Sequence, residues 1–330
     1  MSEPKILKES KNKIKVDFER TSRWEKFKIK YFNPTFVGSA IWYIFRFVLL
    51  LGISYVILYP FFTKIASSFM SSADLVDTTV KLIPKYPTLD RYTNLIVNNG
   101  YFKAMFNTLI LSAVMALIQT FVCSFIAYGF AKYKFKGNGI LFALVIFTMI
   151  VPHNTLRFAM YMKFRYFDIF GIFKLLTGTT LKLLDTFVPL LLLSLTGLAY
   201  RNGLYIFMLR QFFKGVPDEL EESAYIDGSG VFRTFFTIIL PISVPMMITV
   251  FLFSFSWQWT DYFYNDLFFP GAKISLLSNF MGSNLSVSTS EAGANAAAGS
   301  LLIIAPLIIL YLFGQRYLVT GIERSGLTAD

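Results

Sequence analysis

The chain has 330 residues, of which 55% are hydrophobic, and its mean hydropathy is +0.55. Its apolar stretches are longer than the core helices of soluble domains, so the composition excludes an ordinary soluble protein. The net charge of +11 does not indicate a nucleic-acid partner, because ten of the basic residues precede residue 31 and are interleaved with five acids. Attraction to anionic membrane lipid accounts for them better.

Residues 1–38 are predicted to form a basic, cytoplasmic N-terminal arm. Trp24, Phe27 and Phe32 are side chains suited to the membrane interface. The first apolar stretch begins too late and runs too long for a cleavable signal peptide. We therefore expect it to remain as an anchor.

Six apolar stretches are long enough to cross a bilayer, since a spanning helix needs about 20 mostly apolar residues. They cover residues 40–63, 105–130, 139–161, 187–212, 241–260 and 295–317. The sequence thus predicts an all-α polytopic membrane protein with six transmembrane helices in residues 39–325, followed by a cytoplasmic tail, 326–330.

The distribution of Lys and Arg predicts that both termini lie in the cytoplasm. With this topology 19 of the 31 basic residues lie inside, 11 lie outside, and Arg201 falls within a span, in agreement with the positive-inside rule. Five of the outer cations lie between residues 157 and 182. The charges therefore give least support to the two spans between 139 and 213.

Residues with catalytic or metal-binding chemistry are scarce. Cys123 is the only cysteine and His153 the only histidine, so neither a zinc cluster nor a histidine-centred triad can be assembled. We expect His153 to be structural, with a polar lining role as the alternative. No Gly is followed by Lys, so the phosphate-binding Gly-x-x-x-x-Gly-Lys-Ser/Thr element is absent. We do not expect this chain to bind ATP or any other cofactor.

A polar, helix-prone segment, residues 214–241, lies between two long apolar stretches. Pro217, Asp218 and Glu219 are typical of a helix start. Gly228 can close that helix, and Pro241 lacks the amide that a continuing helix would need. The pattern predicts two short helices with a bend at Gly228.

The surface of this segment suits a protein partner. Ser223 and Ala224 would leave a shallow face, while Glu222 and Asp227 would place charge at its edge. The alternative is an amphipathic connector without a partner.

The same segment resembles the coupling loop of permease subunits of binding-protein-dependent ABC importers, whose pattern is Glu-Ala-Ala, then Gly, then Ile-x-Leu-Pro at fixed spacing. The matching residues are Glu222, Ala224, Gly228, Ile238, Leu240 and Pro241, and Ser223 replaces the middle Ala.

Three further segments are similar to carbohydrate importers of this class. Residues 315–322 resemble the tail of the maltose-transporter-type G subunit, residues 203–213 resemble the end of the span that leads into the coupling loop, and residues 257–262 resemble the end of the fifth span. Thr260 stands where Asn is more usual.

The resemblance implies a type I ABC importer permease for a sugar or oligosaccharide, in the cell membrane. Residues 39–325 would be the permease domain, which forms half of the translocation pathway. The implied partners are a second, homologous permease in a heterodimer, two ATPase subunits that carry ATP and Mg, and an extracytoplasmic sugar-binding protein. The chain itself would not be an enzyme.

Candidate substrate contacts lie at the end of the fifth span, where aromatic rings beside polar groups could stack on a sugar. They are Trp257, Trp259, Asp261, Tyr262 and Asn265. The alternative is an aromatic belt at the lipid headgroups. Arg201 and Asn202 are polar residues inside a predicted span, which indicates either a cavity lining or a local break in the helix.

Two other classes of protein stay open. A secondary carrier or channel would use ion-coupling acids within its spans or an inverted repeat, neither of which is evident. A membrane-embedded enzyme would need a catalytic constellation. One His and one Cys make that improbable, although carboxylate chemistry is not excluded.

Overall fold

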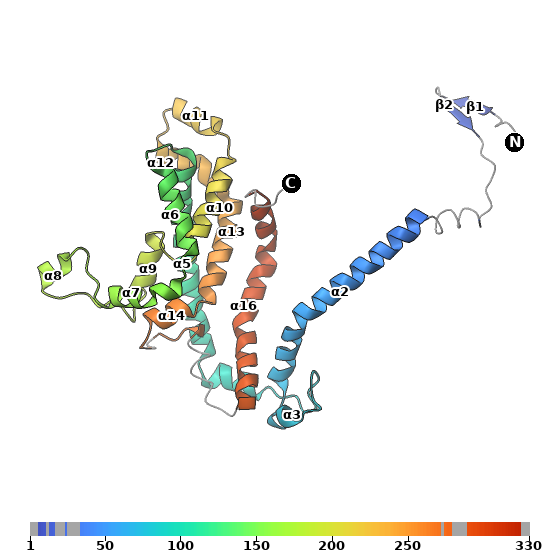
Figure 1. Cartoon of the computed structure of the whole chain (residues 1–330), viewed down its shortest axis with the longest axis horizontal. Coiled ribbons are helices and arrows are strands. Elements are labelled where there is room, and N and C mark those ends of the chain that lie inside the picture. Colours follow the sequence, from blue (N-terminus) through green and yellow to red (C-terminus); the bar gives the residue numbers. More distant parts are fainter. Residues whose placement is uncertain are drawn as a thin grey trace. The chain divides into compact units, whose positions relative to one another are not determined.

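The computed structural model describes residues 6–10, 13–16, 24, 34–271, 274–278 and 289–324 (Figure 1). Chain contacts divide it into two compact units, residues 1–63 and 64–330. In the first unit, strand β1 (Ile6–Ser10) pairs antiparallel with β2 (Lys13–Val16), and helix α2 (Pro34–Phe69) begins there. The fold is otherwise helical, as predicted. Trp24 is exposed, whereas Phe27, Phe32 and the tail 326–330 lie outside the described residues.

The second unit begins near the end of α2 and continues as a series of helices. In chain order these are α3 (Ser72–Val76), α4 (Asp90–Thr93), the π-helix η1 (Asn94–Asn98), α5 (Tyr101–Lys132), α6 (Asn138–Ile150), α7 (His153–Arg165), α8 (Ile172–Thr177), α9 (Val188–Leu195), α10 (Asn202–Lys214), α11 (Glu219–Ile226), α12 (Val231–Thr234), the π-helix η2 (Phe235–Ile239), α13 (Leu240–Trp259), α14 (Phe263–Phe268) and α16 (Thr289–Arg324).

The prediction of six continuous transmembrane helices is not confirmed. Within the described residues, four helical stretches are long and apolar enough to cross a membrane: Gly38–Phe69, Tyr101–Lys132, Val231–Trp259 and Glu291–Leu318. Helices α6 and α7 would form a fifth span only as a bent pair, because their axes differ by 100°.

Both predicted spans between 139 and 213 are broken, and local sequence explains each break. Pro152 follows α6 and cannot donate the amide that would continue the helix. Between α9 and α10 the backbone takes positive φ at Gly197 (73°) and at Arg201 (68°), a conformation that no α-helix contains. The prediction of single helices over 139–161 and 187–212 is therefore wrong.

Helix α5 packs through a stripe of small side chains. Every fourth residue on its buried face is Ala, Ser or Thr: Ala104, Thr108, Ser112, Ala116, Thr120 and Ser124. Small side chains let neighbouring backbones approach closely, which is how helices associate in lipid, where burial of apolar surface drives little. Helices α10 and α13 pack against α5.

The polar segment lies at one end of this bundle, and α3 and α14 lie toward the other (Figure 1). The end of α5 contacts the start of α11. The chain that runs from α6 to α10 therefore returns to the end of the bundle from which it started. The cytoplasmic location of the termini stays a prediction.

Candidate functional site

Helix α11 and the bend after it form a hairpin, residues 214–241, as the sequence predicted. The helix begins at Glu219 with Asp218 as its N-cap, close to the predicted start at Pro217. Gly228 has φ +78° and donates its N–H to the Tyr225 carbonyl at 3.0 Å, while Ser229 donates to Ala224 at 2.9 Å. These bonds close α11 and reverse the chain.

The second half of the hairpin differs from the prediction. Pro241 does not end a short helix, because α12, η2 and α13 run as one helical stretch, Val231–Trp259. The π-helix turn η2 directly precedes Pro241 and widens the helix where the proline has no N–H to donate. The second half of the hairpin is thus continuous with the membrane span that contains α13.

A buried ion pair fixes α11 to the end of α5. The Lys132 ammonium lies 2.5 Å from Asp218 Oδ1 and 3.5 Å from Glu221 Oε1, and it donates to the Val216 carbonyl at 2.6 Å. The side chains of Lys132 and Glu221 are only 6% and 8% exposed. The hydrogen bond from Lys132 holds the pKa of Asp218 below its usual value.

Three tyrosines extend this cluster. Tyr128 donates to Glu221 Oε2 at 3.0 Å, and its hydroxyl lies 3.3 Å from that of Tyr133, which in turn lies 2.9 Å from that of Tyr225 on α11. We call Lys132, Glu221, Tyr128, Tyr133 and Tyr225 the hairpin root. None of the five was singled out from the sequence, although a Lys that closes a span four residues after a Tyr was a usable signal.

Only part of the surface that the sequence predicted for the hairpin is exposed. Ala224 is buried against the hairpin interior, so its small size serves internal packing. Glu222, Ser223 and Asp227 are exposed as predicted. Beside them Ile226 is 86% exposed, a large apolar side chain at the end of the bundle that a protein partner would cover.

The other residues of the predicted coupling set lie where α12 joins α13. Pro241 is exposed, and Ile238 and Leu240 are half-buried against the core that surrounds α5 and α10. They hold the hairpin on the bundle and do not belong to its exposed tip.

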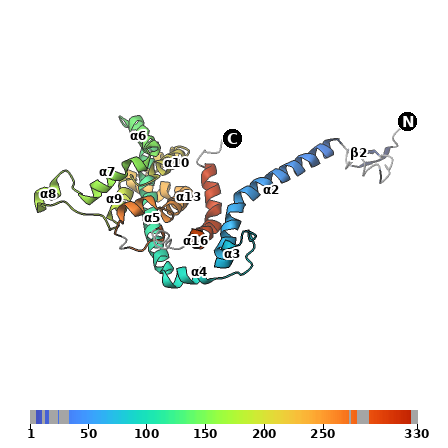
Figure 2. The same ribbon diagram turned by 60° about the horizontal axis from the view of Figure 1, so that its bottom comes forward.

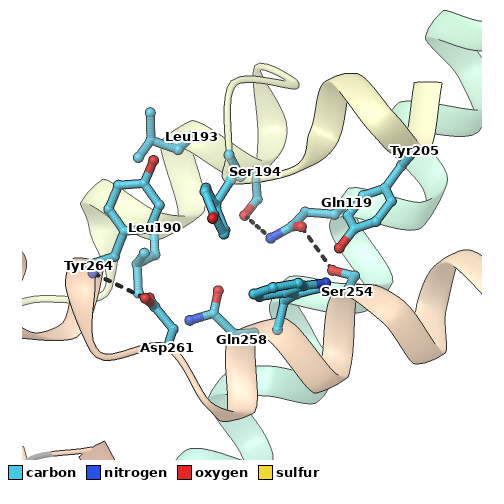
Figure 3. Close-up of a pocket in the computed structure, with 12 residues that line it drawn as sticks. Gln119, Leu190, Leu193, Ser194, Tyr205, Ser254, Gln258, Asp261 and Tyr264 are labelled. Carbon is cyan, nitrogen blue, oxygen red and sulfur yellow. Dashed lines mark hydrogen bonds between the residues drawn. The ribbon is translucent and has the colours of Figure 1, made fainter. Parts of the chain in front are cut away.

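A second candidate site is a small cavity between α5, α9 and α13, with room for about one water molecule (Figure 3). Its wall combines four aromatic rings with polar groups from several elements. The lining residues are Gln119, Leu190, Leu193, Ser194, Ala199, Tyr200, Tyr205, Ser254, Trp257, Gln258, Asp261 and Tyr264.

Gln119 organises the polar side of this cavity. Its amide donates to Ser194 Oγ at 3.2 Å, and its carbonyl oxygen accepts from Ser254 Oγ at 2.8 Å, so that α5, α9 and α13 are joined (Figure 3). Gln258 Nε2 and Asp261 Oδ2 are buried and have no hydrogen-bond partner within the described protein. Such groups are costly unless a ligand or water satisfies them.

The structure brings together only part of the predicted substrate set. Trp257 and Asp261 line the cavity, and the Arg201 guanidinium lies 4.4 Å from the centre of the Trp257 ring. The rest lie elsewhere: Trp259 is buried and donates to the Ile303 carbonyl, Tyr262 is 61% exposed, and Asn202 and Asn265 are buried outside the lining. Arg201 also marks the local break that was the alternative for its span.

The polar lining residues from α5 and α9 were missed from the sequence. Gln119 and Ser194 are isolated polar residues in apolar stretches, which was the available signal. His153 is held by the Tyr264 hydroxyl, 2.7 Å from its Nδ1. Among the described residues, no group of three or more His, Cys, Asp and Glu could hold a metal ion.

Comparison with known families assigns the chain. The family described as "Binding-protein-dependent transport system inner membrane component" matches residues 121–324, which include the hairpin and all of the cavity lining except Gln119. The chain belongs to this family. It is therefore a permease subunit, and the resemblance noted in residues 222–241 is confirmed at the level of the family.

Several relatives of this permease are named for the transport of oligosaccharides. It is similar to the arabinooligosaccharides transport system permease protein AraQ of Bacillus subtilis (strain 168), with 30% identity over 85% of this chain and 93% of that protein. It is also similar to the galactooligosaccharides transport system permease protein GanQ of the same strain, with 25% identity over 86% and 94%.

The fold of the permease is also found in a solved structure. A chain of a bacterial ABC transporter involved in the import of the acidic polysaccharide alginate matches with a TM-score of 0.62 and 22% identity, over 85% of this chain and 97% of that one. This likeness establishes an ABC importer fold.

Proposed function

We propose that the permease forms half of the membrane passage of an ATP-driven importer for a sugar or oligosaccharide. The carbohydrate names of its relatives support this substrate class. A second, homologous permease would supply the other half, two ATPase subunits would carry ATP and Mg, and an extracytoplasmic binding protein would deliver the sugar. The permease itself would bind no cofactor.

The observation that carries the coupling role is the exposed hairpin with its buried root. Ile226, Glu222 and Ser223 face outward, as a docking surface requires, whereas Lys132 and Glu221 lock the base of α11 to α5. When the ATPases close on ATP, they would draw the hairpins together. The continuous stretch from α12 to α13 would pass that motion to the passage.

The cavity between α5, α9 and α13 is the proposed substrate contact, and it would widen to admit a sugar when the passage opens. A sugar has apolar ring faces edged with hydroxyls, so Trp257 and Tyr200 would stack on one face. Gln258 and Asp261 would bond the hydroxyls, which would satisfy their unpaired buried atoms. Arg201, stacked on Trp257, would hold that ring in place.

Affinity purification from detergent tests the coupling role. We expect the wild-type permease to bring down an ATPase and a second permease, and Glu222→Lys to lose the ATPase but keep the second permease. Asp90→Lys, the same charge change on an exposed residue of α4, is the control. A wild-type chain that purifies alone and stable would instead favour a secondary carrier.

Uptake kinetics test the cavity. Trp257→Leu should raise the KM for the transported sugar, because a stacking face is lost from the lining. Tyr262→Leu is the matched control, since Tyr262 is exposed and outside the lining. Equal KM values in both variants and the wild type would exclude the cavity as the substrate contact.

A further inference from the structure

Residues 167–181 form a short projection that we call the finger. A pair of backbone hydrogen bonds between Phe167 and Leu181, at 2.9 and 3.0 Å, closes its base. Within it, Asp168 Oδ1 accepts the N–H of Phe173 at 2.9 Å, at the start of α8. The finger is therefore ordered by its own bonds, although it projects sideways from the bundle in both views (Figures 1 and 2).

The finger is attached at the outer edge of the membrane-spanning bundle, at the end away from the hairpin. Helix α7, which leads into it, is held to α14 by the Arg157–Asp266 ion pair and the His153–Tyr264 hydrogen bond. Helix α14 follows directly on the end of the α13 span. At the base, Phe164 is buried against Phe268, with ring centres 5.1 Å apart.

The preceding helix sets the depth at which the chain turns. Helix α6 has 13 residues, which at about 1.5 Å each cover about 20 Å of a hydrocarbon core about 30 Å thick. The 100° bend then sends α7 across the bundle and not onward through it. Helix α6 alone therefore does not reach the opposite boundary of the core, and the chain turns aside at α7 before it has left the bilayer.

The surface of the finger is apolar at its tip and basic around it. Phe170 is 99% exposed, Leu175 85% and Leu176 76%. Lys174 is exposed within the finger, and Lys163 and Lys182 are exposed in the segments that flank its base. Long cationic side chains around an apolar tip match an acyl region bordered by phosphate groups, because their stems can follow the apolar surface while the ammonium groups reach the headgroups.

We propose that the finger is a membrane-interface anchor that inserts Phe170 and Leu175 among the lipids of the leaflet opposite the hairpin, and that Lys174 and the flanking Lys163 and Lys182 bind anionic phospholipid headgroups. It secures the outer half of the broken α6–α7 span, which no continuous helix holds in the bilayer.

Spin-label accessibility tests the insertion. Phe170→Cys and Leu175→Cys would be labelled in the assembled transporter in phosphatidylglycerol–phosphatidylcholine vesicles, with the wild type as the blank because Cys123 is buried. Ile83→Cys is the matched control, an equally apolar residue, 83% exposed, on another loop. We expect labels at 170 and 175 to collide with oxygen more than with the nickel chelate, and the label at 83 to show the reverse.

A label at 170 that meets the nickel chelate as readily as the label at 83 would overturn the proposal in favour of a finger in water. A label shielded from both reagents would also overturn it, in favour of a protein partner. Headgroup binding is tested by removing phosphatidylglycerol, which should lower oxygen collisions at 170. The triple change Lys163→Gln, Lys174→Gln and Lys182→Gln should abolish this dependence of oxygen collisions on phosphatidylglycerol. The control Lys81→Gln should keep it. A dependence that is unchanged in the triple variant would exclude the lysines as the headgroup ligands.

Discussion

Replacing Lys132 with methionine is expected to abolish ATP-driven uptake while leaving the permease in the membrane. Lys132 joins α5 to Asp218 and Glu221, and its side chain is buried. Removing one partner of a buried ion pair typically costs about 3–5 kcal/mol, because the other charge is left without compensation. Since α11 is the proposed docking element, its attachment to α5 would be lost. Reconstituted vesicles with ATP inside would measure uptake.

Two controls separate coupling from folding in this experiment. Lys134→Met, the same change at an exposed neighbour, should leave uptake near the wild-type level. The double change Lys132→Met with Glu221→Leu removes both charges, so it should restore thermal stability in detergent. If the root transmits force, uptake stays low in the double variant. Recovered uptake would reduce the pair to a structural role.

Replacing Gly228 with proline should have a comparable effect through the backbone. Gly228 has φ +78°, whereas proline is fixed near −65°. The N–H of Gly228 also closes α11 by donating to the Tyr225 carbonyl, and proline has no N–H to donate. Proline therefore removes both the turn and the bond. We expect normal membrane insertion, loss of ATPase binding in the pull-down, and no measurable uptake.

Graded substitutions at the same position show whether backbone conformation is the cause. No atom lies within 4 Å of a Cβ built on Gly228, so alanine meets no steric conflict and costs only the strain of a left-handed residue, about 1–2 kcal/mol. Asparagine tolerates this conformation better and should retain more uptake than alanine. The order Gly, Asn, Ala, Pro is expected, and full activity in the proline variant would remove the hairpin from the coupling mechanism.

The sequence predicted the long spans and the hairpin because each depends on local signals. Residues 105–130 and 241–260 are mostly apolar. Asp218 and Gly228 each act on the nearest turn of α11, one at its start and one just after its end. The break near Pro152 was not predicted, and the break near Arg201 was only one of two alternatives, because hydropathy averages over a window and is blind to backbone dihedrals. Arg201 is a charged residue inside a predicted span, and the structure places it at the break between α9 and α10.

The candidate sites were predicted only where residues are close in sequence. Glu222 and Asp227 belong to one short helix, so a linear motif captures them. The hairpin root joins Lys132 to Glu221 across 89 positions, and the cavity joins Gln119 to Ser254 across 135 positions. Such pairs exist only after the helices have packed, and no propensity of a single segment encodes them.

The close packing of α6 on α10 has a consequence for biogenesis. A Cβ at Gly203 would lie 2.9 Å from the Val145 carbonyl oxygen, so the two backbones are in contact. Helices α6 and α10 have 13 residues each, fewer than the about 20 that cross a bilayer alone. We therefore expect α6 to settle stably in lipid only after α10 has been synthesised, so that residues 138–214 enter the membrane together. A side chain at Gly203 would act on the yield of permease before it acted on transport.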